Sequence, residues 1–334
     1  SPDRNAIING QGAIAQRGTS FVSGANNDGV YMLDRWKLLS DGNDIVDVTQ
    51  ETSTVPTNKQ YAIALDVETT NKKFGITQCV ENKNCVGLIG QTVTLSFQAK
   101  VSATTKLDNV KAAIISWSST ADSPTADMIS AWGSEGTNPT LASNFTYENT
   151  PANLNVTTSY ATYSVSAAVD TSSTANIAVF IWSDVTDTTA GDFLYITDVQ
   201  LEAGAVATSY NQRSYLDSFN ECLRYFYRLR KTNSYGEFVT IRTYSGDDGT
   251  GVLYFSTPMR VQPTLSIDKT VNGTNFAYNL NSISIAASDV SVTQCGIVAA
   301  SASSDAFVTG GGAVIQSNGA SGALDVSFDF SSEL

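Results

Sequence analysis

The sequence predicts an all-β protein with two β-domains separated by one α-helix. Most of the chain falls into short runs in which apolar and polar residues alternate, the pattern of half-buried antiparallel strands. Stretches rich in Gly, Asn, Asp, Ser and Thr separate these runs and predict turns. Residues 215–230 differ, because their apolar positions recur at the three- and four-residue steps of an amphipathic helix.

Residues 91–101 are the clearest predicted strand of the first domain. Odd-numbered positions from 93 to 101 are apolar, whereas even-numbered positions from 92 to 100 are polar. Similar runs cover residues 61–67, 110–117, 160–169, 176–182 and 193–201. Many strands with little helix between them predict a β-sandwich rather than a parallel α/β sheet.

The predicted helix begins near Asp217 or Ser218, either of which suits an N-cap. A basic cluster follows, composed of Arg224, Arg228, Arg230 and Lys231. We expect these cations to complement the helix dipole and form salt bridges, with an anion site as the alternative. Further strands are expected over residues 237–244, 251–256, 264–267, 277–285, 290–298, 313–316 and 324–330. Their position after the helix predicts a second, smaller β-domain.

The charge of the chain excludes several classes of function. With 19 basic and 32 acidic residues, the net charge is −13, which argues against binding nucleic acid or anionic membranes. Histidine is absent, so histidine triads and histidine metal ligands are excluded. No stretch approaches 18 apolar residues and the N-terminus is polar, so we expect neither membrane insertion nor a signal peptide.

Two of the four cysteines lie close together in the sequence. Cys79 and Cys85 flank a polar segment that we expect to be a loop. A disulfide, two free thiols and a metal site all remain open from this spacing. Cys222 lies on the apolar side of the predicted helix and is expected to be a buried small hydrophobe.

Three tryptophans are candidate platforms for a sugar ring. Trp117 and Trp182 each end an apolar strand, and Trp132 lies in a segment rich in Gly, Ser and Asn. Pyranose C–H faces stack on such rings, while nearby polar groups, here Asp184, bind the hydroxyls. The alternative is that these rings pack inside the domain or at a subunit interface.

Several motifs resemble a widespread family of bacteriophage virion proteins that includes tail fibres and related appendages. They are NAIING at 5–10, YMLDRW at 31–36, FLYITDVQLEAG at 193–204, ECLRYF at 221–226 and the terminal SEL. Their order matches the family, and the resemblance covers nearly the whole chain. It implies a jelly-roll sandwich similar to carbohydrate-binding modules at 1–212, a connecting helix at 213–232 and a C-terminal β-domain at 233–334.

The resemblance also implies partners and a cofactor. Members of the family are usually homotrimers that contact other virion proteins, so we expect this chain in a virion, on the tail or the capsid. An Asp near the last strand of carbohydrate-binding jelly rolls often holds a structural calcium, and Asp198 is the similar residue here. No other cofactor is expected.

These observations favour a non-catalytic appendage that binds a host surface glycan. No nucleophile elbow, phosphate-binding loop or zinc motif is present in the sequence, so we expect no enzymatic activity. The acidic chain favours a neutral sugar. The alternatives are a capsid or tail decoration or adaptor protein without a receptor and, less favoured, a polysaccharide depolymerase, which needs only two carboxylates.

Overall fold

The computed structural model describes residues 4–231, 237–244, 248–269, 283–288, 290–301, 312–316 and 326–334. It divides the chain into two compact units, Ser1–Ser218 with Leu334, and Phe219–Glu333. Nearly all described elements are β-strands, which confirms the all-β fold class. None of the helices in the described part of the chain is long and apolar enough to cross a membrane.

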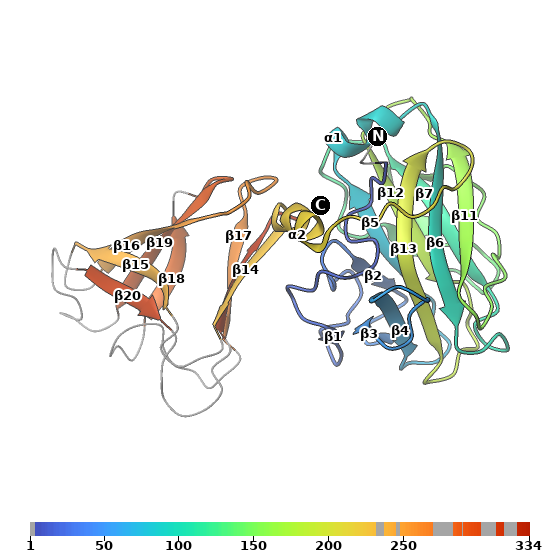
Figure 1. Ribbon diagram of the computed structural model, residues 1–334, viewed down its shortest axis with the longest axis horizontal. Coiled ribbons are helices and arrows are strands. Elements are labelled where there is room, and N and C mark those ends of the chain that lie inside the picture. Colours follow the sequence, from blue (N-terminus) through green and yellow to red (C-terminus); the bar gives the residue numbers. More distant parts are fainter. Residues whose placement is uncertain are drawn as a thin grey trace. The chain divides into compact units, whose positions relative to one another are not determined.

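The first unit is a sandwich of two antiparallel sheets (Figure 1). The six-stranded sheet has the order β1 (Ser20–Phe21), β3 (Val46–Glu51), β4 (Ala62–Val67), β13 (Phe193–Ala203), β6 (Thr92–Val101) and β11 (Ala161–Ala168). The five-stranded sheet has the order β10 (Phe145–Tyr147), β7 (Val110–Trp117), β12 (Asn176–Ser183), β5 (Phe74–Val80) and β2 (Lys37–Ser40).

The sandwich forms because its strands place apolar side chains between the two sheets, as the alternation of β6 predicts. The six strands expected in this part of the chain are confirmed to within two residues at each end. The apolar face of β6, from Val93 to Val101, lies in the main core between the sheets. Each fully buried Val, Leu or Phe there contributes about 1.5–3 kcal/mol to folding.

The five-stranded sheet has a second apolar face, which the chain covers with its own residues. Every residue of β7 and β12 is buried. The covering segment contains a small two-stranded sheet formed by β8 (Ile129–Ala131) and β9 (Thr140–Leu141). Met128, Ile129 and Phe145 pack there with Trp117, Phe180 and Trp182 in one cluster.

The segment around Cys79 and Cys85 is not the expected polar loop. Gln78–Val80 completes β5, and residues 82–88 form the short helix α1 (Asn82–Cys85) and a 3₁₀ turn (Val86–Leu88). Neither cysteine forms a disulfide, and neither do Cys222 and Cys295. Burial raises the pKa of the Cys85 thiol to about 11, so it stays protonated and unreactive at neutral pH.

The predicted helix is shorter than its apolar spacing indicated. Helix α2 covers Tyr215–Leu223, and the division between the two units falls inside it. Ser214 caps its start, accepting a hydrogen bond from the Asp217 amide and donating one to the Asp217 carboxylate. Residues expected to continue the helix instead form strand β14 (Phe226–Lys231).

The reason for this correction lies in the pairing of β14. Residues 226–231 also alternate, so that Tyr227 and Leu229 pack against a core while Arg228 forms an ion pair with Asp329 of β21 (Val326–Ser331). Pairing with β21 and burial of one face override the helical spacing. Arg228, Arg230 and Lys231 therefore lie on a strand and do not complement the dipole of α2.

The second unit contains two further sheets in its described parts. One has the order β14, β21 and β17 (Thr264–Lys269). The other has the order β18 (Ile283–Ser288), β19 (Gln294–Ser301), β16 (Asp248–Tyr254), β15 (Glu237–Thr243) and β20 (Gly312–Gln316). Residues 277–282 of the strand expected at 277–285 lie outside the described residues.

Candidate functional site

A β-bulge in β13 organises the candidate site. The pairing of β13 with β6 shifts between Thr197 and Gln200, and Asp198 lies in this bulge with a φ of 53°. Bulges of this kind re-aim side chains, often beside functional sites. The amide of Val199 donates a 2.9 Å hydrogen bond to the Gly10 carbonyl, which fastens the N-terminal loop to the bulge.

The N-terminal loop is a tight turn at Asn9-Gly10. Gly12 donates its amide to the Asn9 carbonyl at 2.9 Å, and Asn9 has a φ of 57°, which Asn tolerates well. The Asn9 side chain also bonds both backbone groups of Ile14, at 2.9 Å each. The turn is therefore rigid, and it carries Gln11 to the bulge.

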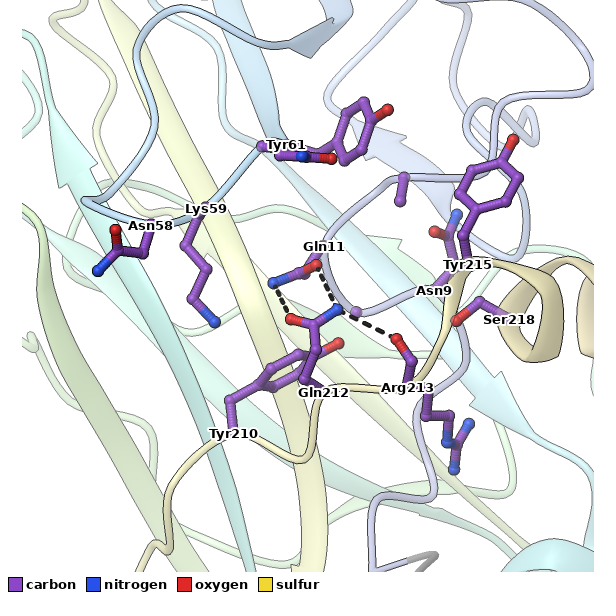
Figure 2. Close-up of a pocket in the computed structure, with 13 residues that line it drawn as sticks. Asn9, Gln11, Asn58, Lys59, Tyr61, Tyr210, Gln212, Arg213, Tyr215 and Ser218 are labelled. Carbon is purple, nitrogen blue, oxygen red and sulfur yellow. Dashed lines mark hydrogen bonds between the residues drawn. The ribbon is translucent and has the colours of Figure 1, made fainter.

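Three separate segments meet beside the bulge and enclose a pocket of about 320 Å³ (Figure 2). They are the N-terminal turn, the loop before β4, and the segment that leads from β13 into the first turn of α2. The lining residues all belong to the first unit: Asn9, Gly10, Gln11, Ala13, Asn58, Lys59, Gln60, Tyr61, Tyr210, Gln212, Arg213, Tyr215 and Ser218.

A buried carboxylate holds the wall of this pocket in place. Asp198 is 4% exposed, and Nζ of Lys59 lies 2.9 Å from its Oδ2. Nε2 of Gln98 donates to the same oxygen at 2.7 Å, and Nε2 of Gln11 donates to Oδ1. The Lys59 ammonium also lies 5.0 Å from the centroid of the Tyr210 ring, a cation–π distance.

Two glutamines close the pocket on another side. Nε2 of Gln11 donates to Oε1 of Gln212 at 2.9 Å, and Nε2 of Gln212 donates back at 3.2 Å (Figure 2). This reciprocal amide pair joins the N-terminal turn to the segment that follows β13. It leaves an aromatic and polar lining, in which tyrosines 61, 210 and 215 accompany side-chain amides and two cations.

The structure places Trp117 and Trp182 away from this pocket and corrects their predicted role. Trp182 is fully buried and stacks on Phe180, with ring centroids 4.6 Å apart. Trp117 is 3% exposed and packs on Phe145 at 4.7 Å. Neither ring offers a face to a ligand, because residues 118–147 cover that side of the sheet.

Trp132 remains a proposed platform for a sugar ring. Its side chain is half-buried and lies 6.0 Å from Phe180, between ring centroids. It lies in the covering segment, apart from the residues that line the pocket.

Asp184 is not a sugar ligand in this structure, because two lysines occupy its carboxylate. It is fully buried, with an ion pair to Lys73 at Oδ1 and to Lys111 at Oδ2, the latter 2.7 Å long. Lys73 also donates to the carbonyls of Trp132, Ser134 and Thr137 at 2.6–3.2 Å. This buried cluster fastens residues 132–137 to the sandwich.

The surroundings of Asp198 do not fit the expected calcium site. Calcium needs several oxygen ligands, whereas the side chains around Asp198 are an ammonium and two amide donors. Over the described residues, no group of three or more acidic or cysteine side chains could hold a metal ion.

The sequence analysis missed the pocket, although two of its motifs contain the Asn9-Gly10 turn and Asp198. Tyr61 and Tyr210 lie far apart in the sequence, and the pairing of β4 with β13 brings their two segments together. The family-like motifs at 5–10 and 193–204 both contribute backbone to this region. They were the sequence feature that could have indicated the pocket.

No protein-family model matches this chain, and no curated protein sequence is similar to it. Among solved structures, it is similar to the enzymatically active domain of tailspike protein 4 of bacteriophage CBA120, with 17% identity and a TM-score of 0.34. That match covers 61% of this chain and 22% of the tailspike chain.

Two other solved structures are similar over comparable stretches. TmCBM61 in complex with β-1,4-galactotriose has 15% identity and a TM-score of 0.31, covering 60% of this chain and 100% of that chain. The CBM22-1–GH10 modules of Clostridium thermocellum xylanase 10B, complexed with xylohexaose, have 13% identity and a TM-score of 0.35. That match covers 62% of this chain and 30% of the xylanase chain.

Proposed function

We propose that this protein binds a glycan without catalysis, in the pocket lined by Tyr61, Tyr210 and Tyr215. The observation that carries this proposal is the combination of aromatic rings with amide and ammonium groups around 320 Å³. Sugar rings stack their C–H faces on aromatic side chains, while their hydroxyls bond fixed polar groups. The ion pair and the amide pair hold these groups in place before a ligand arrives.

The lining of the pocket favours binding over cleavage. Glycoside hydrolysis uses two carboxyl groups about 5–10 Å apart, on opposite sides of the bond that breaks. None of the described residues that line the pocket is acidic. A sugar bound there would therefore have no carboxylate pair beside it.

The biological setting that we propose is a phage virion appendage that attaches to a host surface glycan. The motif resemblance supports this role, including a homotrimer on the tail or capsid with other virion proteins as neighbours. Three weak pockets engaging one cell surface would raise the overall affinity by orders of magnitude. A decoration or adaptor protein without a receptor is the alternative.

The test is a glycan array followed by calorimetry with single variants. Tyr215 is 60% exposed, so Tyr215→Ala should leave the fold intact and weaken binding roughly tenfold, as should Tyr61→Ala. The matched control is Tyr254→Ala in the second unit, a tyrosine that is 73% exposed and should not change binding.

Other outcomes would separate the alternatives. If Trp132→Ala abolishes binding while both pocket variants bind normally, the site lies at Trp132. Release of reducing ends from a bound polysaccharide would make the protein a depolymerase. If the array and host cells give no binding at all, the decoration or adaptor role stands.

A further inference from the structure

The charge of the pocket is opposite to that of the chain. The whole sequence has 32 acidic against 19 basic residues. The described residues that line the pocket include Lys59 and Arg213 and no Asp or Glu. A lining rich in donors and without a carboxylate favours a ligand that brings negative acceptor oxygens of its own.

The one carboxylate behind the wall does not reverse this local charge. Asp198 is 4% exposed and does not line the pocket. Its two carboxylate oxygens form an ion pair with Lys59 and accept hydrogen bonds from Gln98 and Gln11. The Asp198 carboxylate therefore stabilises the wall of the pocket, and its oxygens are not directed at a ligand. Asp198 and the Tyr210 ring together fix the position of the Lys59 ammonium.

Lys59 is placed to meet a ligand. Its side chain is 21% exposed, and Figure 2 shows it extending from its loop toward the Gln11–Gln212 pair. An ammonium has three N–H donors, so one ion pair leaves further donors for a ligand. The exposed amides of Asn58 and Gln60 flank it in the same loop.

We propose that the pocket takes an acidic sugar, whose ring carboxylate bonds Lys59 while the tyrosines contact the ring. This inference rests on the proposed function and names the class of its ligand. It replaces the neutral sugar that the net charge favoured. Distant surface charges are screened beyond about 8 Å at physiological salt, so the Lys59 ammonium in the pocket decides its preference.

The experiment compares a hexuronate oligosaccharide with its carboxyl-reduced counterpart, which differs only in charge. We expect the acidic form to bind at least roughly tenfold more tightly in calorimetry, as a charge-assisted hydrogen bond allows. The preference should shrink when the salt concentration rises. Equal binding of both forms, or tighter binding of the reduced form, overturns the acidic-sugar proposal but leaves glycan binding intact.

A third ligand, the same reduced oligosaccharide carrying a sulfate ester, separates carboxylate from sulfate recognition. Tighter binding of the sulfated form than of the hexuronate contradicts the assignment to a sugar carboxylate. If no glycan on the array binds, the proposed function fails as well, so the two failures are distinguishable.

Variants at Lys59 locate the effect. Lys59→Gln should bring the ratio of acidic to reduced binding close to one, because a ratio cancels any loss of affinity that both ligands share. Lys59→Arg retains the positive charge and should retain the ratio. This variant still tests the proposal if Lys59→Gln does not fold. Lys106→Gln removes an exposed lysine that pairs with Asp187 and is the matched control. An unchanged ratio in folded Lys59→Gln, or a lost ratio in folded Lys59→Arg, overturns the assignment.

Discussion

The amide of Val199 and the carbonyl of Gly10 form a 2.9 Å hydrogen bond that joins the N-terminal turn to the bulge of β13. The two backbones lie so close that a Cβ atom built on Gly10 would be 2.2 Å from the Val199 carbonyl oxygen. This contact brings Gln11 within hydrogen-bond distance of Asp198. One wall of the pocket therefore depends on a position that has no room for a side chain.

Gly10→Ala should push the turn away from the bulge and disrupt the pocket. We expect a loss of about 1–3 kcal/mol in the free energy of unfolding, the usual cost of overpacking, together with loss of glycan binding. Urea unfolding and calorimetry measure the two effects. Gly87→Ala is the control, because a Cβ there meets nothing within 4 Å. Normal glycan binding by Gly10→Ala would show that the pocket does not need this close approach.

The loop before β4 is held at a second point, by a tyrosine just before β11. The Tyr160 hydroxyl donates to the Thr54 carbonyl at 2.7 Å, and residues 58–61 of the same loop line the pocket. The Lys100 ammonium lies 5.8 Å from the Tyr160 ring centroid and 5.6 Å from that of Tyr195. Tyr160 therefore acts on the pocket through the position of this loop.

Tyr160→Phe should release the loop and weaken glycan binding several-fold, with about 0.5–1.5 kcal/mol lost from the free energy of unfolding. Tyr147→Phe is matched, since the Tyr147 hydroxyl donates to the Pro139 carbonyl at 2.8 Å, outside the pocket. It should lose similar stability and bind normally. Equal binding by both variants would contradict a positioning role for Tyr160.

Two neighbouring lysines should differ sharply in their effect on stability. Lys73 is fully buried and pairs with Asp184, whereas Lys72 is 41% exposed and pairs with an equally exposed Asp41. Lys73→Met should cost about 3–5 kcal/mol, because it removes one partner of a buried pair. Lys72→Met should cost less than about 1 kcal/mol. Denaturant unfolding measures both, and limited proteolysis should detect release of residues 132–137 in Lys73→Met alone.

Asp66 should make the stability of the first unit depend on pH. It pairs directly with Asp47 across β3 and β4, and its Oδ1 is buried without a hydrogen-bond partner. Burial and three nearby acids raise its pKa from 3.8 to about 6. A raised carboxyl pKa contributes stability below pH 3.8, and this contribution is lost as the pH rises through about 6.

Asp66→Asn should therefore stabilise the protein at pH 7.5 by about 1 kcal/mol, a value reduced for solvent screening. The fall in unfolding free energy between pH 4 and 6.5 should also become smaller. Urea unfolding across this range tests both. Asp187→Asn, at an exposed carboxylate paired with Lys106, is the control for the loss of one surface charge. A steeper profile in Asp66→Asn would show that the sign of this effect is wrong.

Six strands of the sandwich were predictable because each carries its pattern locally. The alternation of β6 fixes which face is buried, and its register with β11 and β13 follows that face. The sugar role predicted for Trp117 and Trp182 was wrong, although a signal was present. Ile114-Ile115 in β7 and the run from Val179 to Trp182 in β12 are apolar at consecutive positions, which is typical of strands buried on both faces.

By itself, the sequence determined the net charge, the fold class, six strands of the first unit and a helix that begins near residue 215, since patterns among near neighbours in the chain predict these elements. The tertiary structure decided what Asp198, Lys59 and the tyrosines of the pocket do. Their roles depend on the β-bulge that sets the direction of the Asp198 side chain. They also depend on Gly10, which lets the N-terminal turn approach the bulge. A site assembled from three distant segments has no local periodicity, so folding alone brings its residues together.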